Sequence, residues 1–323
     1  MTGSRPVQDP WAIPEVPILA RFAHHRLAER RDDTGWLAEA WQDPSSRVLV
    51  IAPDGTAAVD EGPDGPNLRM LPTAEAGQAG TRVLLGQADG TVYFALLADD
   101  PSGGPDWRGL RQLAMHLTDL DVGLLTSAVA LGAWHLRHPR CPRCGAGTEV
   151  AQAGWIRVCP VDSSQHFPRT DPAVIMLVHD GDGHCVLARG PQWAPGRMSV
   201  LAGFVEAGES AEAAVAREVA EEVGISVRDV RYAGSQPHPF PASLMLGYTA
   251  LLDGDPTLRI DGGEIVEAGW FGRDEVRRAS DWGAEGRLGD GKAGPPNDAV
   301  LRGLPSMMSI ARQLINSWLA ELE

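Results

Sequence analysis

Three carboxylates recur at close spacing in the C-terminal half of this 323-residue chain, at Glu218, Glu221 and Glu222. On a helix these side chains would fall within one turn and share one side. Clustered oxygen ligands of this kind suit Mg²⁺ or Mn²⁺, which takes a few carboxylates together with water and substrate phosphate oxygens. The spacing therefore indicates a site for a metal-bound phosphate, with a solvated acidic helix face as the alternative.

A helix that could position these carboxylates is indicated at both of its ends. Ser210 is a suitable N-cap and Gly224 a suitable C-terminal stop, while Val215, Val219 and Val223 recur as an apolar stripe. We therefore expect a helix of about three to four turns whose valines are buried.

The loop 201–209 precedes this helix and adds two more carboxylates. From Gly203 to Ile225 the residues match the Nudix box at every defined position: Gly, five residues, Glu, seven residues, then Arg-Glu-aliphatic-any-Glu-Glu-any-Gly-aliphatic. The region resembles the Nudix hydrolases, which cleave a nucleoside diphosphate linked to another moiety. The resemblance implies Mg²⁺ or Mn²⁺ held by Glu218, Glu221, Glu222 and the carbonyl of Ala202, with Arg217 pairing with Glu209.

Hydrolysis of a diphosphate needs help because its anionic oxygens repel the attacking water. Divalent ions that bridge those oxygens reduce the repulsion and activate the water. A carboxylate must also accept the proton of that water. The candidates are Glu221, Glu222 and Glu264, and the sequence does not choose among them. The resemblance implies that Glu264, in the turn 261–265, holds metal as well.

A proline-rich segment beyond the box bears on the substrate. It reads Ser235-Gln236-Pro237-His238-Pro239-Phe240-Pro241-Ala242-Ser243. Alternate prolines fix φ and predict a stiff extended segment, whose Phe240 could stack on a base; a rigid strand connection is the simpler alternative. The segment is similar to the Ser-Gln-Pro-Trp-Pro-Phe-Pro-x-Ser motif of the NADH pyrophosphatase branch of the Nudix family. It differs in His238, where the motif has Trp.

Resemblance to this branch implies the substrate and its contacts. We expect hydrolysis of the diphosphate of NADH or NAD⁺ to AMP and nicotinamide mononucleotide, and removal of NAD caps from RNA 5′ ends. The residues implied to bind substrate are Phe167, Gln236, Pro237, His238, Pro239, Phe240, Pro241, Ala242, Ser243 and Ala311. Members of the branch are commonly homodimers. The alternatives are another Nudix specificity, such as ADP-ribose or a diadenosine polyphosphate, or a non-catalytic zinc-ribbon binding protein.

Three of the four cysteines form a second candidate site. Cys141 and Cys144 form a Cys-x-x-Cys pair, and fourteen residues later Cys159 and Asp162 form a second pair, which is the layout of a zinc ribbon. The usual pattern has a fourth thiolate where Asp162 stands, and His166 could compete for that position. We predict structural zinc on these four residues, bound more weakly than by four thiolates; a ribbon stable without metal is the alternative.

Composition and charge restrict the possible partners. Hydrophobic residues make up 43% of the chain and charged residues 22%, as in ordinary globular proteins. No apolar run reaches the length of a membrane span and no secretory leader is evident, so we expect no membrane partner and a cytoplasmic location. A net charge of −15 disfavours nonspecific binding to nucleic acid, so an RNA substrate would be held by its end.

The order of apolar runs predicts an α/β (α+β) protein in four parts. We expect an N-terminal β-rich domain at 1–106, a helical connector at 107–140, a zinc-ribbon-like module at 141–168 and a Nudix domain at 169–323. The resemblance implies that the last part is an α/β/α sandwich with a mixed sheet. Within it we expect strands at 173–178, 185–188, 244–252 and 265–271, a helix at 306–319 and a surface insertion at 283–296.

Overall fold

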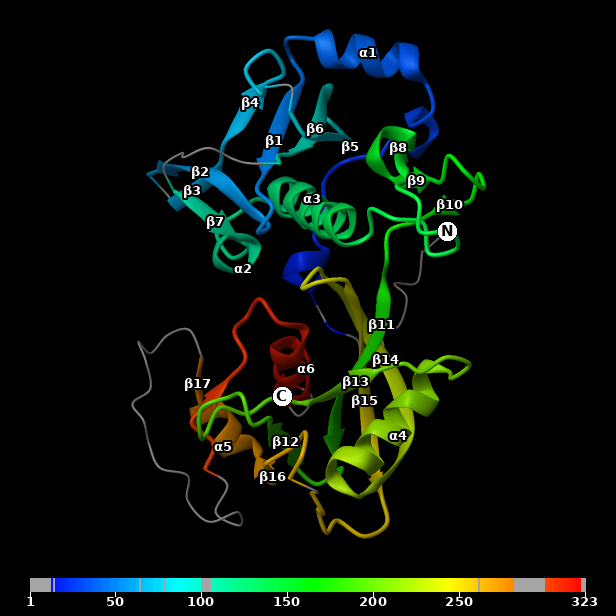
Figure 1. Cartoon of the computed structure of the whole chain (residues 1–323). Helices are drawn as coiled ribbons and strands as arrows, with labels where there is room; N and C mark the ends of the chain where they lie inside the picture. Colours follow the sequence, from blue (N-terminus) through cyan, green and yellow to red (C-terminus); the bar gives the residue numbers. More distant parts are fainter. Residues whose placement is uncertain are drawn as a thin grey trace, which may run out of the picture. The chain divides into compact units, whose positions relative to one another are not determined.

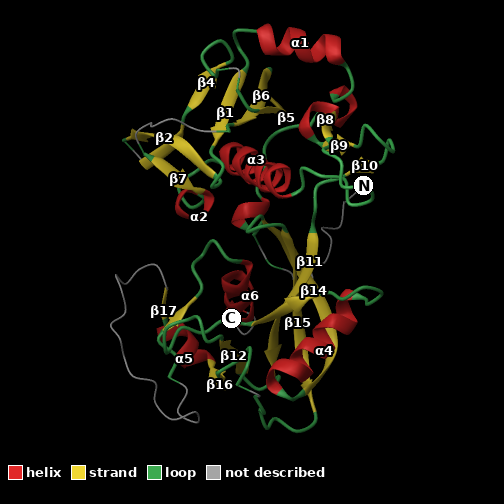
Figure 2. Ribbon diagram, in the orientation of Figure 1, coloured by secondary structure: helices red, strands yellow, loops and turns green. Residues whose placement is uncertain are grey.

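The structure is a computed structural model and describes residues 13, 15–63, 65–77, 79–99, 106–260, 262–281 and 300–320. The insertion expected at 283–296 lies outside the described residues. The chain divides into two compact units. The N-terminal unit comprises Ile18–Thr170 and Pro237–Ser243, and the C-terminal unit comprises the rest. Figure 1 labels the helices and strands, and Figure 2 distinguishes them by colour.

A mixed sheet forms the centre of the N-terminal unit. Its order is β3-β2-β1-β6-β5, with β4 paired to β1 and β7 to β2; β1 and β6 are parallel and the other pairs are antiparallel. The predicted β-rich domain is therefore confirmed. The strands are β1 (Arg47–Ile51), β2 (Thr56–Gly62), β3 (Gly65–Leu68), β4 (Met70–Pro72), β5 (Thr81–Ala88), β6 (Thr91–Leu97) and β7 (Trp107–Gly109).

The helices of this unit pack on that sheet, and α3 contacts β1, β5 and β6. The prediction that the helical part begins at Trp107 was wrong, because Trp107–Gly109 is a strand that pairs with β2. The short helix α2 follows at Leu110–Leu113, and the long helix α3 starts where the Thr118 hydroxyl accepts a hydrogen bond from the Asp121 N–H. The helices are η1 (Ile18–Ala20), η2 (Ala28–Arg30), α1 (Thr34–Gln42), α2 (Leu110–Leu113) and α3 (Asp119–Arg137).

The predicted ribbon hairpin is present as a small antiparallel sheet of order β10-β9-β8. Its strands are β8 (Glu149–Ala151), β9 (Ile156–Val158) and β10 (Gln165–His166), with the turn η3 (Gln152–Gly154) between the first two. The indole N–H of Trp155 donates to the carbonyl of Leu84 at 2.7 Å, and the Arg31 guanidinium lies 3.7 Å from the Trp155 ring centroid. These contacts hold the ribbon against the larger sheet.

The C-terminal unit is a sandwich, as expected. Its sheet has the order β14-β15-β11-β12-β16, with β13 paired to β11. Alternate residues of β11 face opposite sides: Val174 and Met176 join the apolar cluster under α4, whereas Ile175 and Leu177 join the cluster under α6. The strands are β11 (Asp171–His179), β12 (His184–Arg189), β13 (Leu201–Phe204), β14 (Ser226–His238), β15 (Ser243–Asp253), β16 (Glu267–Gly272), β17 (Ser280–Asp281) and β18 (Gly303–Leu304).

Three helices complete this unit: α4 (Ala211–Val223), α5 (Arg273–Arg278) and α6 (Ile310–Ala320). Helix α6 begins later than the predicted residue 306, because the Ser309 hydroxyl accepts a hydrogen bond from the Ala311 N–H and residues before it form a turn. No helix in the described part of the chain is long and apolar enough to cross a bilayer.

The proline-rich segment is extended only as far as His238, where β14 ends. Pro239–Ala242 then forms a turn, so the prediction of a fully extended segment was wrong. The reason is that β14 and β15 are neighbours in one sheet, and the chain between them must reverse its direction.

Candidate active site and metal centre

Helix α4 positions the clustered carboxylates, and it has the predicted ends. The Ser210 hydroxyl accepts a hydrogen bond from the Ala213 N–H, and Gly224 adopts a left-handed conformation with φ of 71°. Val215, Val219 and Val223 are fully buried, each contributing about 1.5–3 kcal/mol relative to exposure. The apolar stripe therefore anchors the helix, and its neighbouring face carries Glu218 and Glu222.

The absence of a side chain at Gly203 leaves room for the Glu218 carboxylate beside β13. A Cβ atom at position 203 would lie 1.9 Å from the Glu218 Cδ and 2.0 Å from its Oε1, far inside contact distance. The glycine of the box is therefore required for close approach: its missing side chain leaves the space that the Glu218 carboxylate fills.

Arg217 ties the loop before α4 to the helix. Its guanidinium donates two hydrogen bonds of 2.9 Å to the Glu209 carboxylate, which confirms the predicted pair. It also donates to Glu218, to Glu221 and to the carbonyl of Phe204, each at 2.9 Å. A planar fork of five donors can satisfy this set, whereas an ammonium group cannot.

Two carboxylates of the helix are buried side by side without enough positive charge to offset them. Burial is the largest cause of the raised pKa of Glu218, and burial followed by the Glu218 charge raises the pKa of Glu222 to about 8. The exposed Glu264 raises both pKa values further, so it lies within the same electrostatic field. Among the described residues, the buried Glu222 Oε2 has no hydrogen-bond partner.

This arrangement fits a divalent cation. A bound cation would supply the missing partner for Glu222 and offset the repulsion among Glu218, Glu222 and Glu264. Ala202, on the adjacent strand β13, contributes a backbone group that hydrogen-bonds to Glu222 and lowers its pKa in part. Glu221 differs from the other acids, because its side chain is 61% exposed and is held by Arg217.

The predicted substrate-binding residues fall into both units. Phe167 and Pro237–Ser243 belong to the N-terminal unit, and the Phe167 side chain is exposed. Gln236 and Ala311 belong to the C-terminal unit, where both are 2% exposed. Ala311 lies in the apolar cluster under α6, and the buried Gln236 Oε1 has no partner among the described residues.

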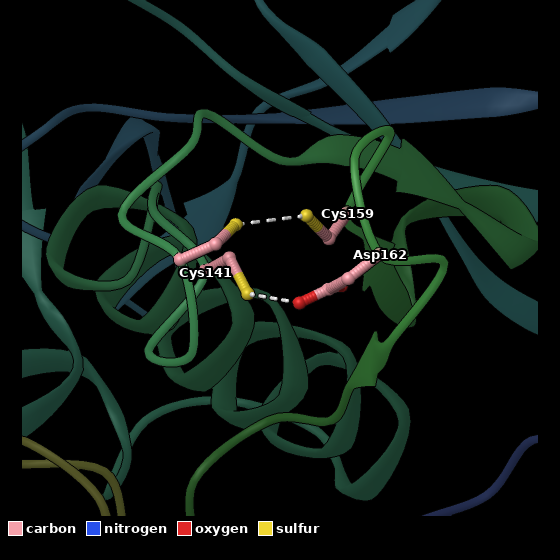
Figure 3. A group of neighbouring side chains, drawn as sticks. Cys141, Cys159 and Asp162 are labelled. Atoms are coloured by element: carbon pink, nitrogen blue, oxygen red, sulfur yellow. Dashed lines mark hydrogen bonds between the residues drawn. The ribbon is translucent and has the colours of Figure 1, made fainter.

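The second candidate site gathers Cys141, Cys144, Cys159 and Asp162, whose ligand atoms all lie within 4.8 Å of one another. The Cys144 and Cys159 sulfurs are 3.5 Å apart, and the Cys141 sulfur lies 3.5 Å from the Asp162 Oδ2. Figure 3 shows the side chains of Cys141, Cys159 and Asp162 pointing toward one shared space. Tetrahedral zinc with Zn–S bonds of about 2.3 Å separates its sulfurs by roughly 3.8 Å. The cluster is therefore compatible with zinc.

Ser164, which the sequence reasoning missed, orients Asp162. Its backbone N–H donates to the Asp162 Oδ1 at 3.0 Å and its hydroxyl donates to the same oxygen at 2.5 Å, so Oδ2 is left to face the cysteines. These hydrogen bonds hold the pKa of Asp162 well below its usual range. His166, the predicted competitor, instead lies 3.0 Å from the Ser164 hydroxyl through its Nε2. The Asp-x-Ser spacing is the local signal that could have revealed this support.

Family models match three consecutive parts of the chain. The NADH pyrophosphatase-like rudimentary NUDIX domain matches residues 45–134, the NADH pyrophosphatase zinc ribbon domain matches residues 136–167, and the NUDIX domain matches residues 169–288. The zinc ribbon and the Nudix box are therefore found where the motifs indicated.

Relatives match over most of the chain. The NAD-capped RNA hydrolase NudC of Mycobacterium bovis is 42% identical over 316 residues, which cover 94% of this chain and 95% of the relative. NudC of Stutzerimonas stutzeri is 39% identical over 73% of this chain and 76% of its own. The NAD-capped RNA hydrolase NUDT12 of Macaca fascicularis is 34% identical over 72% of this chain and 51% of its own. Because of this similarity and the intact Nudix box, the chain belongs to the NADH pyrophosphatase branch of the Nudix hydrolases, the family of the NudC proteins.

Proposed function

We propose that this protein hydrolyses the diphosphate bond of NADH or NAD⁺, giving AMP and nicotinamide mononucleotide, and that it removes NAD caps from RNA 5′ ends. The observation that carries the proposal is the pair of buried carboxylates Glu218 and Glu222 beside Gly203, close enough to Glu264 for their charges to interact. The names of the relatives support the dinucleotide and the capped RNA as substrates.

The proposed residues have separate roles in metal binding, proton transfer and substrate binding. Mg²⁺ or Mn²⁺, when bound, would neutralise diphosphate oxygens and lower the pKa of the attacking water. Glu218, Glu222 and the Ala202 carbonyl are the proposed ligands, and Glu264 completes the set or accepts the proton of the water. Glu221 is the weaker candidate for proton acceptor, because Arg217 already occupies its carboxylate. Phe167, Gln236, Ala311 and the segment 237–243 are the proposed substrate contacts.

Two further features of the family are proposed for this chain. We infer a homodimer, which is common in the branch. We also infer a reducing compartment such as the cytoplasm, because Cys141, Cys144 and Cys159 are free thiols and zinc needs them as thiolates rather than as disulfides.

The proposal is tested by incubating the protein with NADH and Mg²⁺ and measuring AMP and reduced nicotinamide mononucleotide. Glu222→Gln removes one ligand charge and should lower kcat by a factor of about 10² or more. Glu212→Gln is the matched control, since Glu212 is exposed in the first turn of the same helix. Absence of AMP with wild-type protein, or equal rates for the two variants, would defeat the assignment.

The alternatives predict different outcomes. Another Nudix specificity would give faster hydrolysis of ADP-ribose or a diadenosine polyphosphate than of NADH. A non-catalytic zinc-ribbon protein would hydrolyse none of these. The hydrogen bonds of Arg217 and the close approach of Glu218 to Gly203 favour a working hydrolase over the second alternative.

A further inference from the structure

Arg189 and Glu267 form a largely buried ion pair next to the turn that carries Glu264. Arg189 is the last residue of β12 and Glu267 is the first residue of β16, and they are direct partners in the antiparallel register of these strands. The Arg189 Nε donates to the Glu267 Oε2 at 2.8 Å, and the two side chains are only 11% and 16% exposed. Glu264 lies three residues before Glu267, and all three residues belong to the C-terminal unit.

The backbone and the guanidinium of Arg189 both act on the end of this turn. The Arg189 carbonyl accepts a hydrogen bond from the Val266 N–H at 3.0 Å, so the strand pairing continues to the residue before Glu267. The Arg189 Nη1 donates to the Trp193 carbonyl at 3.0 Å, so the guanidinium is held on two sides. A planar group with two fixed hydrogen bonds has little freedom to turn, and Glu267 therefore has a fixed partner.

The opposite end of the turn is fixed by helix α4. The Arg259 N–H donates to the Val223 carbonyl at 2.8 Å, and a Cβ at Gly224 would lie 2.9 Å from the Arg259 Cβ. The turn therefore starts in contact with the C-terminal end of the helix that carries Glu218 and Glu222. Its second anchor is the strand pair of β12 and β16.

Between the two anchors, the side chain of Ile265 is buried and that of Glu264 is exposed. Ile265 is 7% exposed and belongs to the apolar cluster under α4, whereas residues 262–264 are exposed. The charge of Glu264 nevertheless acts on Glu218 and Glu222. Because a glycine-containing turn has high conformational freedom, an exposed carboxylate in it keeps its distance from these acids only if the ends of the turn are fixed.

We propose that Arg189 is a positioning residue, which holds the Glu264 carboxylate toward the metal-binding acids of α4 by pairing with Glu267. The inference rests on the proposed hydrolase function and gives a role in it to a residue outside the Nudix box. Without the guanidinium, the Glu267 carboxylate would lose the partner that offsets its burial, and it would move toward solvent and release the start of β16. Groups that orient a ligand or a catalytic side chain typically contribute about 10- to 100-fold to metal affinity or activity.

A double-mutant cycle separates positioning from general stabilisation. Arg189→Met should lower kcat for NADH, or the affinity for Mn²⁺ measured by electron paramagnetic resonance, about 10- to 100-fold. Both quantities are followed because Glu264 can serve as a proton acceptor or as a metal ligand. In the Glu264→Gln background, Arg189→Met should change the affected quantity less than about threefold, because the side chain that it positions is already disabled.

Arg273→Met is the matched control. Arg273 is half-buried and directly follows the other end of β16, where its guanidinium contacts the ring and the carbonyl of Trp318. That end of the strand is about 17 Å from Glu267, at about 3.4 Å per residue. The control should keep kcat and Mn²⁺ affinity within about threefold of wild type. Glu267→Gln, which keeps the acceptor but removes the charge, should shift the same quantity as Arg189→Met by a smaller factor, and it serves if Arg189→Met does not fold.

Hydrogen exchange of the metal-free protein gives a readout that does not need activity. The Val266 amide should exchange about tenfold or more faster in Arg189→Met than in wild type, and at the wild-type rate in Arg273→Met. Unchanged exchange at Val266 would overturn the inference. An equal loss from Arg189→Met with and without Glu264 would also overturn it, because Arg189 would then act by another route, such as direct contact with substrate. A protein that shows the exchange difference and the coupling in Mn²⁺ affinity but does not hydrolyse NADH would refute only the proposed function.

Discussion

Gly203→Ala should disable the active site while leaving most of the fold in place. The new Cβ would lie 1.9 Å from the Glu218 Cδ, whereas ordinary van der Waals contact begins near 3.4 Å, so the carboxylate must retreat by about 1.5 Å. A displacement of about 1 Å at a catalytic group costs on the order of 10²-fold in rate. We therefore expect kcat for NADH to fall at least about 100-fold and the Mg²⁺ concentration for half-maximal activity to rise.

The assay compares this variant with Gly35→Ala. A Cβ at position 35 meets only the Asp33 Oδ1 at 3.7 Å, an ordinary contact, and the position lies in helix α1. Thermal unfolding of Gly203→Ala should show a loss of only about 1–3 kcal/mol, typical of overpacking. The reasoning is refuted if Gly203→Ala keeps activity within threefold of wild type with an unchanged Mg²⁺ requirement.

Three other perturbations have expected outcomes. Zinc affinity, measured by competition with a chromophoric chelator, should rise in Asp162→Cys, which supplies a fourth thiolate. It should fall about 10- to 100-fold in Ser164→Ala, because Ser164 orients the Asp162 carboxylate. Lower affinity in Asp162→Cys and higher affinity in Ser164→Ala would contradict this role. Arg217→Lys should lower kcat/KM about tenfold or more, whereas Arg228→Lys, at an exposed pair, should not. The pKa of His238 is about 4 in the folded protein, against the ordinary value of 6.5. Between pH 6.5 and pH 4 the unfolded state therefore binds more protons than the folded state, and the free energy of unfolding falls as the pH drops through this range. Denaturant midpoints at pH 7 and pH 5 should differ less in His238→Gln than in wild type, and an equal difference would exclude this titration.

What could be predicted from the sequence depends on how local its determinants are. Helix α4 was predicted correctly because Ser210, Gly224 and the valine stripe lie within the helix or at its ends. The strand Trp107–Gly109 was missed because its partner β2 lies far away in the chain, and its own residues also fit a helical pattern. The turn at 239–242 was missed for the same reason, since the pairing of the flanking strands imposes it.

The cysteine cluster and the contact at His238 differ in the same respect. Cys141, Cys144, Cys159 and Asp162 could be identified by spacing, because two short turns bring the pairs together and Ser164 supports Asp162 from two residues away. No local signal marks the contact of residue 111 with His238, which are 127 residues apart. Only the fold brings them together.

The metal-binding box and the proline-rich segment differ in how much of the chain each depends on. The Nudix box is nearly self-contained: Gly203 admits the Glu218 carboxylate, and Arg217 ties the preceding loop to the same helix, so the metal-binding chemistry depends on one short segment. The segment 237–243 instead belongs to the N-terminal unit by its contacts, although it connects two strands of the C-terminal sheet. Arg111 contacts His238 and Phe240 rather than residues of the box, so a change at His238 or Arg111 leaves the hydrogen bonds of Arg217 in place.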